Sequence, residues 1–511
     1  MAYKRPGTYI EESLTPLAAA SADPGDASAA FVGVLAQGPT RPTKISSWSQ
    51  FTAFYGGFGD GRNLMPFAVY QYFNNGGRAA WIVRALASDA VKASVTLQDR
   101  ATVAADTLKI TAISGGVWGN DLNVSVIDPG TGTGRFSLVV FKGGTAEINA
   151  VERWNDLSMD PSSSRYALNL VNSPVSGSTK IRITNLHASS AYDSTQTPAL
   201  AANTVLAAGS DGVATADLAA AAATLETETQ DVLVVNLPGV TDSTKLSPVI
   251  TWAETLGRAF VVVDLPQALS GDTSAQTQTA WLSATTGLPV SSHVAAYGPW
   301  LRVDDPASLV SGSVRVLPPG GSVLGQYSRI DASTGVQKPP AGLDTVLRGV
   351  LDLDTRFKGS ELDALYDKGI NVIQAQPGAG IVIWGARTLK PGNPDRYISV
   401  RRSLIMIKKA LVDNTRFAIF EPNNEALWSR IEAIISQYLL TLQQSGVLKG
   451  STPDEAYFVK CDAENNSPAT AQQGIVNIEV GVALSSPAEF VIIKIGQFEG
   501  GSAASETTEI A

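Results

Sequence analysis

Residues 217–305 alternate short, strongly apolar runs with stretches of helical length. The apolar runs are DVLVVNLPG, RAFVVVDLP and HVAAYGPWLRV, and the stretches between them include PVITWAETLG and SAQTQTAWLSATTG. Strands that are continuously apolar are typically covered on both faces, and strands that are separated by helices return to the sheet in parallel. The sequence therefore predicts a mostly parallel sheet that is covered by helices.

An earlier block, residues 31–86, carries the same pattern. FVGVLAQG predicts a strand, SSWSQFTAFYG and LMPFAVYQYF predict two helices, and AAWIVRAL predicts another strand. Ser46 or Ser47 is suited to cap the first helix, and Asn74 with Asn75 is typical of the end of the second. We expect this block to open an α/β core that resumes at about residue 209 and continues to residue 385.

The segment between these two parts changes to short β-type runs. DTLKITAI, DLNVSVID, FSLVVFK, SRYALNLV and TKIRITNL are separated by Gly, Pro, Ser and Asn. Regular short strands with turn residues between them are typical of an all-β domain. We expect such a domain at residues 91–208, inserted into the α/β chain, with its exit near Ala208 to Gly212.

The C-terminal region, residues 386–486, predicts an α+β domain. One face of a predicted helix carries Leu427, Trp428, Ile431, Ile434, Ile435, Tyr438, Leu439 and Leu442. This spacing indicates a helix that packs on a core. EAYFVKCDA and GIVNIEVGVAL then predict a hairpin or a small sheet.

Both ends of the chain carry a strand-like segment beside a linker-like one. Thr8 to Glu12 precedes TPLAAASADPGDASAA, Thr15 to Ala30, whose small and polar residues are typical of a tether. PAEFVIIKIGQF, residues 487–498, is among the strongest strand signals, and only a tail rich in Gly, Ser and Thr follows it. We expect no later element of the chain to pair with this strand, whose free edges would aggregate unless another chain covered them.

Composition excludes several classes of protein. A length of 511 residues predicts two to four domains, and a net charge of -9 argues against a protein that grips phosphate backbones. Cys461 is the only cysteine, so an intrachain disulfide is impossible and a reducing compartment is expected. The chain shows neither a signal peptide nor a long apolar segment, so we expect it to be made in the cytoplasm and to stay soluble there.

Candidate catalytic features are sparse. YGGFGDGR, at Tyr55 to Arg62, does not fit the phosphate-binding patterns, so a surface turn is expected. His187, His293 and Cys461 show no metal-ligand spacing. Asp264 ends a predicted strand and His293 begins another, which leaves an α/β enzyme with these two groups as an alternative. We expect no metal and no cofactor.

A basic cluster stands out against the acidic composition. Residues 387–416 hold eight basic side chains against two acidic ones, a net charge of +6. On a helix that starts near Ser399, basic residues gather beside an apolar side formed by Leu404, Ile407 and Leu411. The four basic residues of that helix face are Arg401, Arg402, Lys408 and Lys409. Two interpretations stand: a solvated helix face, or a contact with an acidic partner.

Several ordered motifs together resemble the contractile tail sheath family of bacteriophages and phage-tail-like injection systems. The N-terminal motifs are RPGTYIEE, FVGVLAQGPTRPTKISSWSQFTAFYGGF and YQYFNNGGRAAWIVRAL. GGVWGNDLNVSV and PPGGSVLGQYSRIDASTGVQKPPAG resemble central segments. GINVIQAQPGAGIVIWGARTL, RYISVRRSLIMIKKAL, FEPNNEALWSRI and VGVALSSPAEFVIIKIGQF follow in the order of the family. The resemblance spans nearly the whole chain.

The resemblance implies a structural protein, not an enzyme. Six-subunit rings would stack helically around an inner tube and shorten to drive that tube through a cell envelope, with baseplate and tail terminator proteins as further partners. Neither direct nucleic-acid binding nor membrane insertion is implied. The particle would be a virion tail or an injection-system particle that is assembled in the bacterial cytoplasm.

The resemblance also implies which segments join the subunits. Both termini would reach neighbouring subunits and complete a sheet in their C-terminal domains, which gives the terminal strand a partner in another chain. The residues implied in donation are Thr8, Tyr9, Ile10, Glu11, Phe490, Val491, Ile492, Ile493, Ile495 and Phe498. The receiving sheet is expected at Tyr457, Val459, Ile475, Ile478, Val480 and Val482, and the inner-tube contact at Arg401, Arg402, Lys408 and Lys409.

The expected architecture is thus a central α/β core with an inserted all-β domain and a C-terminal α+β domain that is completed by strands of neighbouring subunits. The expected divisions are residues 1–30 (N-terminal arm and linker), 31–90 and 209–385 (core), 91–208 (inserted domain, on the outer surface), 386–486 (C-terminal domain, facing the tube) and 487–511 (C-terminal arm). A non-contractile tail or surface-layer protein that uses the same strand exchange remains the second alternative to the sheath.

Overall fold

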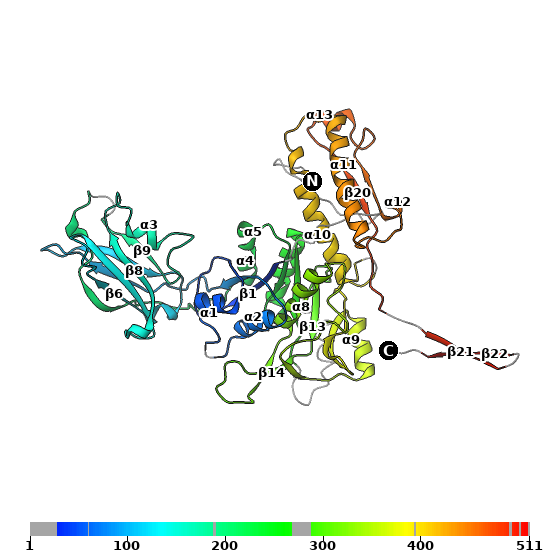
Figure 1. Ribbon diagram of the computed structural model, residues 1–511, viewed down its shortest axis with the longest axis horizontal. Helices are drawn as coiled ribbons and strands as arrows, with labels where there is room; N and C mark the ends of the chain where they lie inside the picture. Colours follow the sequence, from blue (N-terminus) through cyan, green and yellow to red (C-terminus); the bar gives the residue numbers. More distant parts are fainter. Residues whose placement is uncertain are drawn as a thin grey trace.

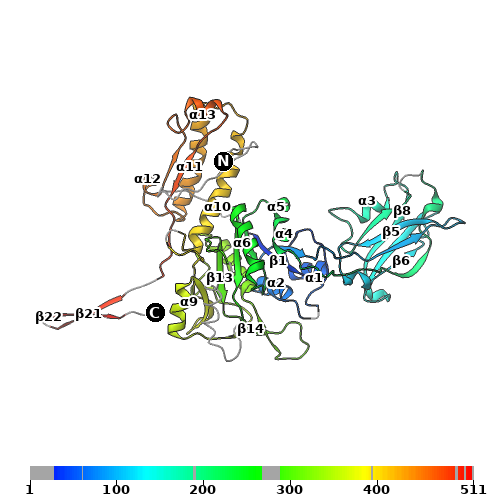
Figure 2. The ribbon, with the colours of Figure 1, turned by 180° about the vertical axis from the view of Figure 1, so that it is seen from behind.

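The computed structural model describes residues 28–59, 61–187, 191–267, 288–392, 395–489, 493–499 and 502–508. A central α/β body lies between a β-rich lobe on one side and a helical C-terminal unit on the other (Figure 1). A terminal hairpin projects away from the body, as both views show (Figures 1 and 2). Thr8 to Glu12 lies outside the described residues.

The α/β body is built on an eight-stranded sheet with the order β18-β17-β13-β12-β11-β1-β3-β2. Its strands are β1 (Ser28–Val34), β2 (Thr43–Ile45), β3 (Ala80–Ala85), β11 (Leu233–Asn236), β12 (Ala259–Asp264), β13 (Val294–Gly298), β17 (Ile370–Gln376) and β18 (Gly380–Ile383). The neighbouring pairs from β3 to β17 are parallel, and β2 and β18 pair antiparallel at the two edges. The predicted parallel sheet is therefore present.

The first strand begins earlier than the sequence predicted. β1 starts at Ser28, so residues 28–30, which were assigned to the linker, belong to the sheet. Ala29 and Ala30 are buried between β3 and β11. Small side chains fit an interior strand that is flanked on both sides, and in a sequence the same residues resemble a flexible tether.

Helices cover both faces of this sheet. Those of the body are α1 (Trp48–Tyr55), α2 (Leu64–Asn74), α4 (Leu218–Ala223), α5 (Leu225–Glu228), α6 (Ser243–Leu256), α8 (Gly320–Ser333) and α9 (Gly359–Asp367). α1, α2 and α8 contribute to the core on one face, and α4, α5, α6 and α9 contribute to the core on the other. Ser47 caps α1 by accepting a hydrogen bond from the backbone N–H of Gln50, as expected. The predicted helix within SAQTQTAWLSATTG lies outside the described residues.

HVAAYGPWLRV forms two strands in different sheets, whereas the sequence predicted a single strand. β13 ends at Gly298, and β14 (Leu301–Asp304) pairs antiparallel with β15 (Val314–Leu317) and β16 (Val350–Leu353). Pro299 lacks the N–H that a ladder needs, so the strand cannot continue through it.

The β-rich lobe contains a four-stranded sheet and a three-stranded sheet around a core of its own. Its elements are β4 (Ser94–Gln98), β5 (Asp106–Ala112), η1 (Val117–Asp121), β6 (Leu122–Ile127), β7 (Arg135–Lys142), η2 (Glu147–Asn149), β8 (Ala150–Ser158), α3 (Ala167–Val171), β9 (Ile181–Asn185), η3 (Ser194–Gln196) and β10 (Ala201–Val205). The strand orders are β10-β6-β7-β8 and β4-β5-β9.

Two sequence assignments in the lobe were wrong. SRYALNLV contains the helix α3, in which Ala167 and Val171 are buried one turn apart. β8 was missed because it is an edge strand whose residues are mostly half-buried or exposed, so its sequence has no apolar alternation.

Arg84 connects the β-rich lobe to the α/β body through hydrogen bonds to both. Its buried guanidinium donates to the carbonyl oxygens of Leu35 (2.7 Å) and Gly38 (3.1 Å) in the body and of Gly115 (3.0 Å) in the lobe. An antiparallel bridge between Val91 and Ser210 closes the lobe where the chain leaves the body and returns to it. The hydrogen bonds of one rigid guanidinium therefore span the joint between the two units.

The C-terminal unit starts with α10 (Ile398–Thr415) and continues with the elements η4 (Arg416–Ala418), α11 (Glu425–Gln444), α12 (Pro453–Ala456), β19 (Tyr457–Lys460), α13 (Pro468–Gln472) and β20 (Glu479–Val482). Six of the eight residues predicted on the packing face of α11 are buried: Leu427, Trp428, Ile431, Ile435, Leu439 and Leu442. The sequence therefore identified this face correctly.

The terminal strand has a partner within its own chain. β21 (Ile493–Glu499) pairs antiparallel with β22 (Ser502–Thr508), from Ile493 opposite Thr508 to Glu499 opposite Ser502. The expectation that nothing later in the chain pairs with this strand was wrong. Two glycines separate the two segments in the sequence, and a two-residue Gly-Gly link is typical of a hairpin.

Candidate assembly interface

β19 and β20 form a two-stranded antiparallel sheet that lies on α11. The register runs from Tyr457 opposite Val482 to Lys460 opposite Glu479. Tyr457, Val459, Val480 and Val482 pack against the core that α11 supplies. In the part of the chain that the structure describes, this sheet has two strands, so an added strand can extend it.

Two residues of the expected receiving set lie outside this sheet. Ile475 and Ile478 precede β20 in irregular backbone, although Ile478 packs on the same core. The side chain of Asn466 accepts a hydrogen bond from the backbone N–H of Asn477 (2.5 Å) and donates one to its carbonyl oxygen (2.9 Å). The Asn466 side chain therefore makes the backbone hydrogen bonds that a neighbouring strand would otherwise make. Strand propensity does not detect such side-chain pairing.

The expected donor residues are only partly described. Thr8, Tyr9, Ile10 and Glu11 lie outside the described residues, as do Phe490, Val491 and Ile492. Ile493, Ile495 and Phe498 lie in β21, opposite Thr508, Glu506 and Ala503 of β22. Donation of these segments to a neighbour therefore stays a prediction.

The basic face predicted on α10 is not a single exposed surface, because Arg401 and Arg402 are buried. Their side chains are 3% and 2% exposed. Arg401 pairs with Asp395, and Arg402 binds both carboxylate oxygens of Asp331 on α8. The assignment of these two arginines to an inner-tube contact was wrong, because they serve as ionic links inside the subunit.

Electrostatics support this internal role. Burial alone would lower the pKa of Arg402, but the Asp331 carboxylate raises it above its ordinary value. Burial alone would raise the pKa of Asp395, but Lys390 and Arg401 hold it below its ordinary value. Arg402 and Asp395 are therefore both charged at neutral pH.

Lys408 and Lys409 differ from the two arginines because they are only half-buried. Lys409 pairs with Asp413, whose side chain is 40% exposed. Of the four residues predicted for the inner-tube contact, these two lysines lie near the surface.

The alternative catalytic pair does not converge. His293 lies just before β13 and Asp264 ends the parallel neighbour β12, with Val261 opposite Val294 and Asp264 opposite Tyr297. About four residue steps, or about 13 Å of strand, separate the two groups. The Nδ1 atom of His293 contacts the carbonyl oxygen of Ala259 at 2.9 Å. The two residues therefore lie at opposite ends of the sheet.

Asp264 instead forms hydrogen bonds between elements of the core. Its carboxylate accepts hydrogen bonds from the backbone N–H groups of Gly320 (2.7 Å), at the start of α8, and Gly239 (3.0 Å), in the loop after β11. Burial raises its pKa to about 6. An acidic group at the carboxyl end of a strand here positions a helix and a loop.

The glycine-rich loop after α1 is a surface turn, as expected. Gly56 ends α1 in the left-handed conformation, with φ of 89°. The carbonyl oxygen of Gly61 accepts a hydrogen bond from Arg315 Nη1 at 2.9 Å. Gly59 faces open space. The loop thus joins α1 to α2 around an arginine of β15.

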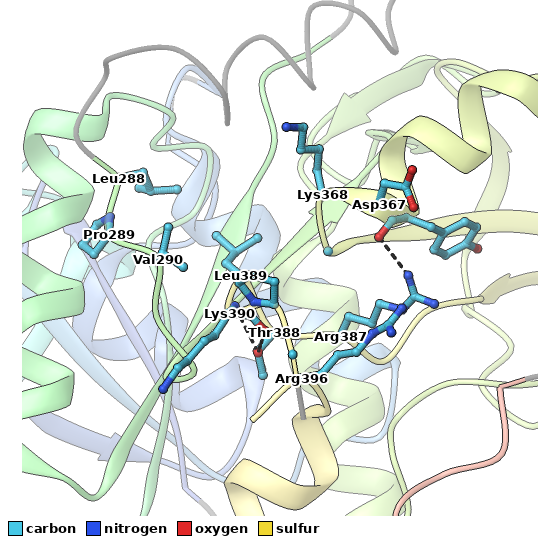
Figure 3. Close-up of a pocket in the computed structure, with 14 residues that line it drawn as sticks. Leu288, Pro289, Val290, Asp367, Lys368, Arg387, Thr388, Leu389, Lys390 and Arg396 are labelled. Carbon is cyan, nitrogen blue, oxygen red and sulfur yellow. Dashed lines mark hydrogen bonds between the residues drawn. The ribbon is translucent and has the colours of Figure 1, made fainter. Parts of the chain in front are cut away.

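A cavity of about 490 Å³ lies beside Arg387 (Figure 3). Its lining includes Leu288, Val290, Tyr366, Lys368, Lys390 and Arg396. Three of its basic residues have carboxylate partners, since Lys390 pairs with Asp395, and both Arg387 and Arg396 pair with Glu489. Charged side chains thus join several segments at this cavity, and among the described residues that line it no nucleophile has an adjacent base.

The described ranges hold no group of three His, Cys, Asp or Glu side chains that could bind a metal ion. Within the same residues, no helix combines the length and the hydropathy that crossing a membrane requires.

Two protein-family models match the chain. The phage tail sheath protein central domain matches residues 211–389, and the phage tail sheath C-terminal domain matches residues 392–498. The two ranges together span more than half of the sequence. The chain belongs to the phage tail sheath protein family. The β-rich lobe of this family member lies outside both matched ranges, as does β22.

Curated relatives agree with the family assignment. The tail sheath protein of Vibrio phage KVP40 is 30% identical over 154 residues, which cover 30% of this chain and 22% of that protein. The tail sheath protein of Enterobacteria phage T4 is 30% identical over 158 residues, which cover 30% of this chain and 23% of that protein. Each match thus spans less than a quarter of the relative's length.

Solved structures share the fold over nearly the full length. The helical sheath of the anti-feeding prophage in its contracted state is 23% identical, with a TM-score of 0.56 over 97% of this chain and 100% of that chain. The PVC sheath complex of an extracellular contractile injection system, also contracted, is 21% identical, with a TM-score of 0.57 and 98% of each chain covered. The sheath tail protein Lin1278 of Listeria innocua is 13% identical, with a TM-score of 0.58 and 96% of each chain covered.

Proposed function

We propose that this chain is the subunit of a contractile sheath, in which rings of six copies stack helically around an inner tube and shorten to drive the tube through a cell envelope. The observation that carries the proposal is the match to both tail sheath domains, central and C-terminal, in consecutive order along the chain. The likeness in fold to sheath subunits of two contractile systems supports it.

Strand exchange would join the copies. The β19–β20 sheet has one face on α11 and edges at which another strand can add, while β21 lies on a hairpin that projects from the body (Figure 2). Each apolar side chain that such a strand buries contributes about 1.5–3 kcal/mol. A copy that gives a strand to one neighbour and accepts one from another makes a heterologous contact, which builds open helical tubes.

The remaining assignments follow from this arrangement. The N-terminal segment Thr8 to Glu12 would add to a neighbouring sheet as the second donated strand. The β-rich lobe, which projects from the body, would lie on the outer surface, and the C-terminal unit would face the tube with Lys408 and Lys409 near the contact (Figure 1). The partners would be the inner tube protein, a baseplate and a tail terminator, in a phage tail or an injection-system particle assembled in the bacterial cytoplasm.

Truncation tests the proposal most directly. We expect the purified full-length chain to form hollow cylinders in electron micrographs, and a variant that ends at Glu489 to stay as folded, unassembled subunits. A variant that ends at Glu499 is the matched control, because it lacks β22 but keeps β21, and it should still form cylinders. Normal cylinders from the variant that ends at Glu489 would contradict donation by the C-terminal strand.

A further inference from the structure

The C-terminal arm is held to the α/β body a few residues before β21 begins. After β20, the chain is still paired with the C-terminal unit, since Leu484 bridges Leu448 and the N–H of Ser485 points to the carbonyl oxygen of Val447 at 3.4 Å. Pro487 has no N–H and cannot continue this pairing. The chain then descends beside the body towards the hairpin (Figures 1 and 2).

Glu489 binds the C-terminal arm to the α/β body. Its carboxylate accepts hydrogen bonds from Arg387 Nε (2.9 Å to Oε1) and Nη2 (2.7 Å to Oε2), and from the hydroxyl of Tyr397 (3.4 Å). Arg396 Nη2 lies 4.0 Å from the same carboxylate. The side chains of Arg387 and Glu489 are only 8% and 16% exposed, so water screens the pair weakly.

The socket for Glu489 is built by the body. Arg387 Nη1 donates to the carbonyl oxygen of Tyr366 at the end of α9 at 2.9 Å, a bond drawn in Figure 3. The backbone N–H of Arg387 donates to Asn371 Oδ1 (2.7 Å) in β17, and Asn371 Nδ2 donates to the carbonyl oxygen of Arg387 (2.8 Å). The guanidinium is thus oriented by α9 and β17 and presents one planar edge to the arm.

The position of this grip determines how far β21 can reach. From Glu489 to Ile493 there are four residue steps, which span at most about 14 Å. If Glu489 were released, the last point of attachment would be Ser485, and eight steps would span about 28 Å. The state of one ion pair therefore changes the length of the tether by about a factor of two.

We propose that the Glu489–Arg387 pair is a clamp that sets the length of the C-terminal tether, so that β21 is offered to the acceptor sheet of a second copy from a fixed point on the α/β body. The inference rests on the proposed function, because it assumes that β21 is donated. The proposal takes the shorter tether to be long enough to reach the acceptor sheet; beyond that length, the effective concentration of a tethered segment falls as about the −3/2 power of tether length, so release lowers it about threefold.

The test compares the critical concentration for cylinder formation, measured by sedimentation, between the wild-type protein and four full-length variants. Glu489→Gln removes the carboxylate of the pair, Arg387→Gln removes its guanidinium, and the double variant removes both. Glu147→Gln is the matched control, because Glu147 forms an exposed pair with Arg153 in the β-rich lobe, away from the acceptor sheet. Hydrogen exchange of residues 484–499 in the unassembled proteins reports whether the arm is released, and thermal unfolding reports whether the body is intact.

We expect Glu489→Gln to speed exchange in this segment, to leave the unfolding temperature of the body unchanged and to raise the critical concentration about threefold. The double variant should be no worse than the worse single variant, because both disable the same pair. An unchanged critical concentration together with fast exchange in Glu489→Gln would overturn the clamp and leave strand donation intact. Cylinders from the chain that ends at Glu489 would instead overturn the donation itself.

Discussion

Substitution of Arg402 by methionine should break the joint between α10 and the α/β body. Both guanidinium Nη atoms bind the two carboxylate oxygens of Asp331 on α8, with Nη1 at 3.0 Å from Oδ1. The guanidinium also lies 4.5 Å from the centre of the Tyr327 ring. Methionine keeps much of the apolar stem but leaves the Asp331 carboxylate buried without a counter-charge.

The size of the effect follows from burial. Arg402 is 2% exposed and Asp331 5%, so solvent screening is slight. Removing one partner of a buried, hydrogen-bonded ion pair costs about 3–5 kcal/mol, because the remaining charge has lost its compensation. We expect a loss of this order in the free energy of unfolding of the unit that contains α8 and α10. Urea unfolding, with hydrogen exchange of these two helices, measures it.

Two control variants separate the pair from its surroundings. Lys409→Met breaks the Lys409–Asp413 pair on the same helix, and an exposed pair of this kind contributes less than about 1 kcal/mol. The double variant Arg402→Met with Asp331→Asn leaves no buried charge and should recover a large part of the loss. If Arg402→Met cost no more than Lys409→Met, the argument that Arg402 is an internal link would fail.

Further substitutions test the core. Gly321→Ala should destabilise the body by about 1–3 kcal/mol, since a Cβ at Gly321 would lie 2.2 Å from the carbonyl oxygen of Ala68 on α2. Gly359→Ala should instead stabilise the body by about 0.5–1 kcal/mol, because its Cβ would meet nothing within 4 Å. Equal unfolding temperatures for the two variants would contradict both expectations. Because the pKa of Asp264 is raised to about 6 in the fold, its contribution to stability is fully present below pH ~4 and is lost as the pH rises through about 6, an amount of about 3 kcal/mol. Asp264→Asn cannot titrate, so its stability relative to wild type should rise between pH 4 and pH 7, and parallel urea-midpoint curves would refute the assignment.

Local patterns predicted elements whose environment is uniform along their length. The predictions of β11, β12 and the apolar face of α11 are correct because their apolar residues recur at a regular interval. A strand covered on both faces needs an apolar residue at every position, and a helix packed along one side needs one at each turn. β8 was missed because an edge strand has no such requirement. The ordered motifs identified the family because they combine many such local constraints along one chain.

The candidate site was only partly predictable. The pairing of β19 with β20 follows from strand propensity and short separation in the sequence. The partner of β21 within its own chain was missed because β22 consists of small and polar residues that carry little strand signal. Glu489 fell within the expected C-terminal arm, but the sequence could not show that it binds the body, because its partner Arg387 lies 102 residues earlier in the chain.

The order of apolar and polar residues by itself determined the parallel sheet and the packing face of α11, and the ordered motifs carried the resemblance to the tail sheath family. It could not distinguish Arg402 from Lys408, because both are cations on one helix and only the position of Asp331, 71 residues away from Arg402, makes one of them internal. Burial of a charge depends on the partners that the folded chain brings to it, whereas burial of an apolar side chain depends largely on its own surface. The tertiary structure alone therefore decided which charges link the units of the subunit and which remain near its surface.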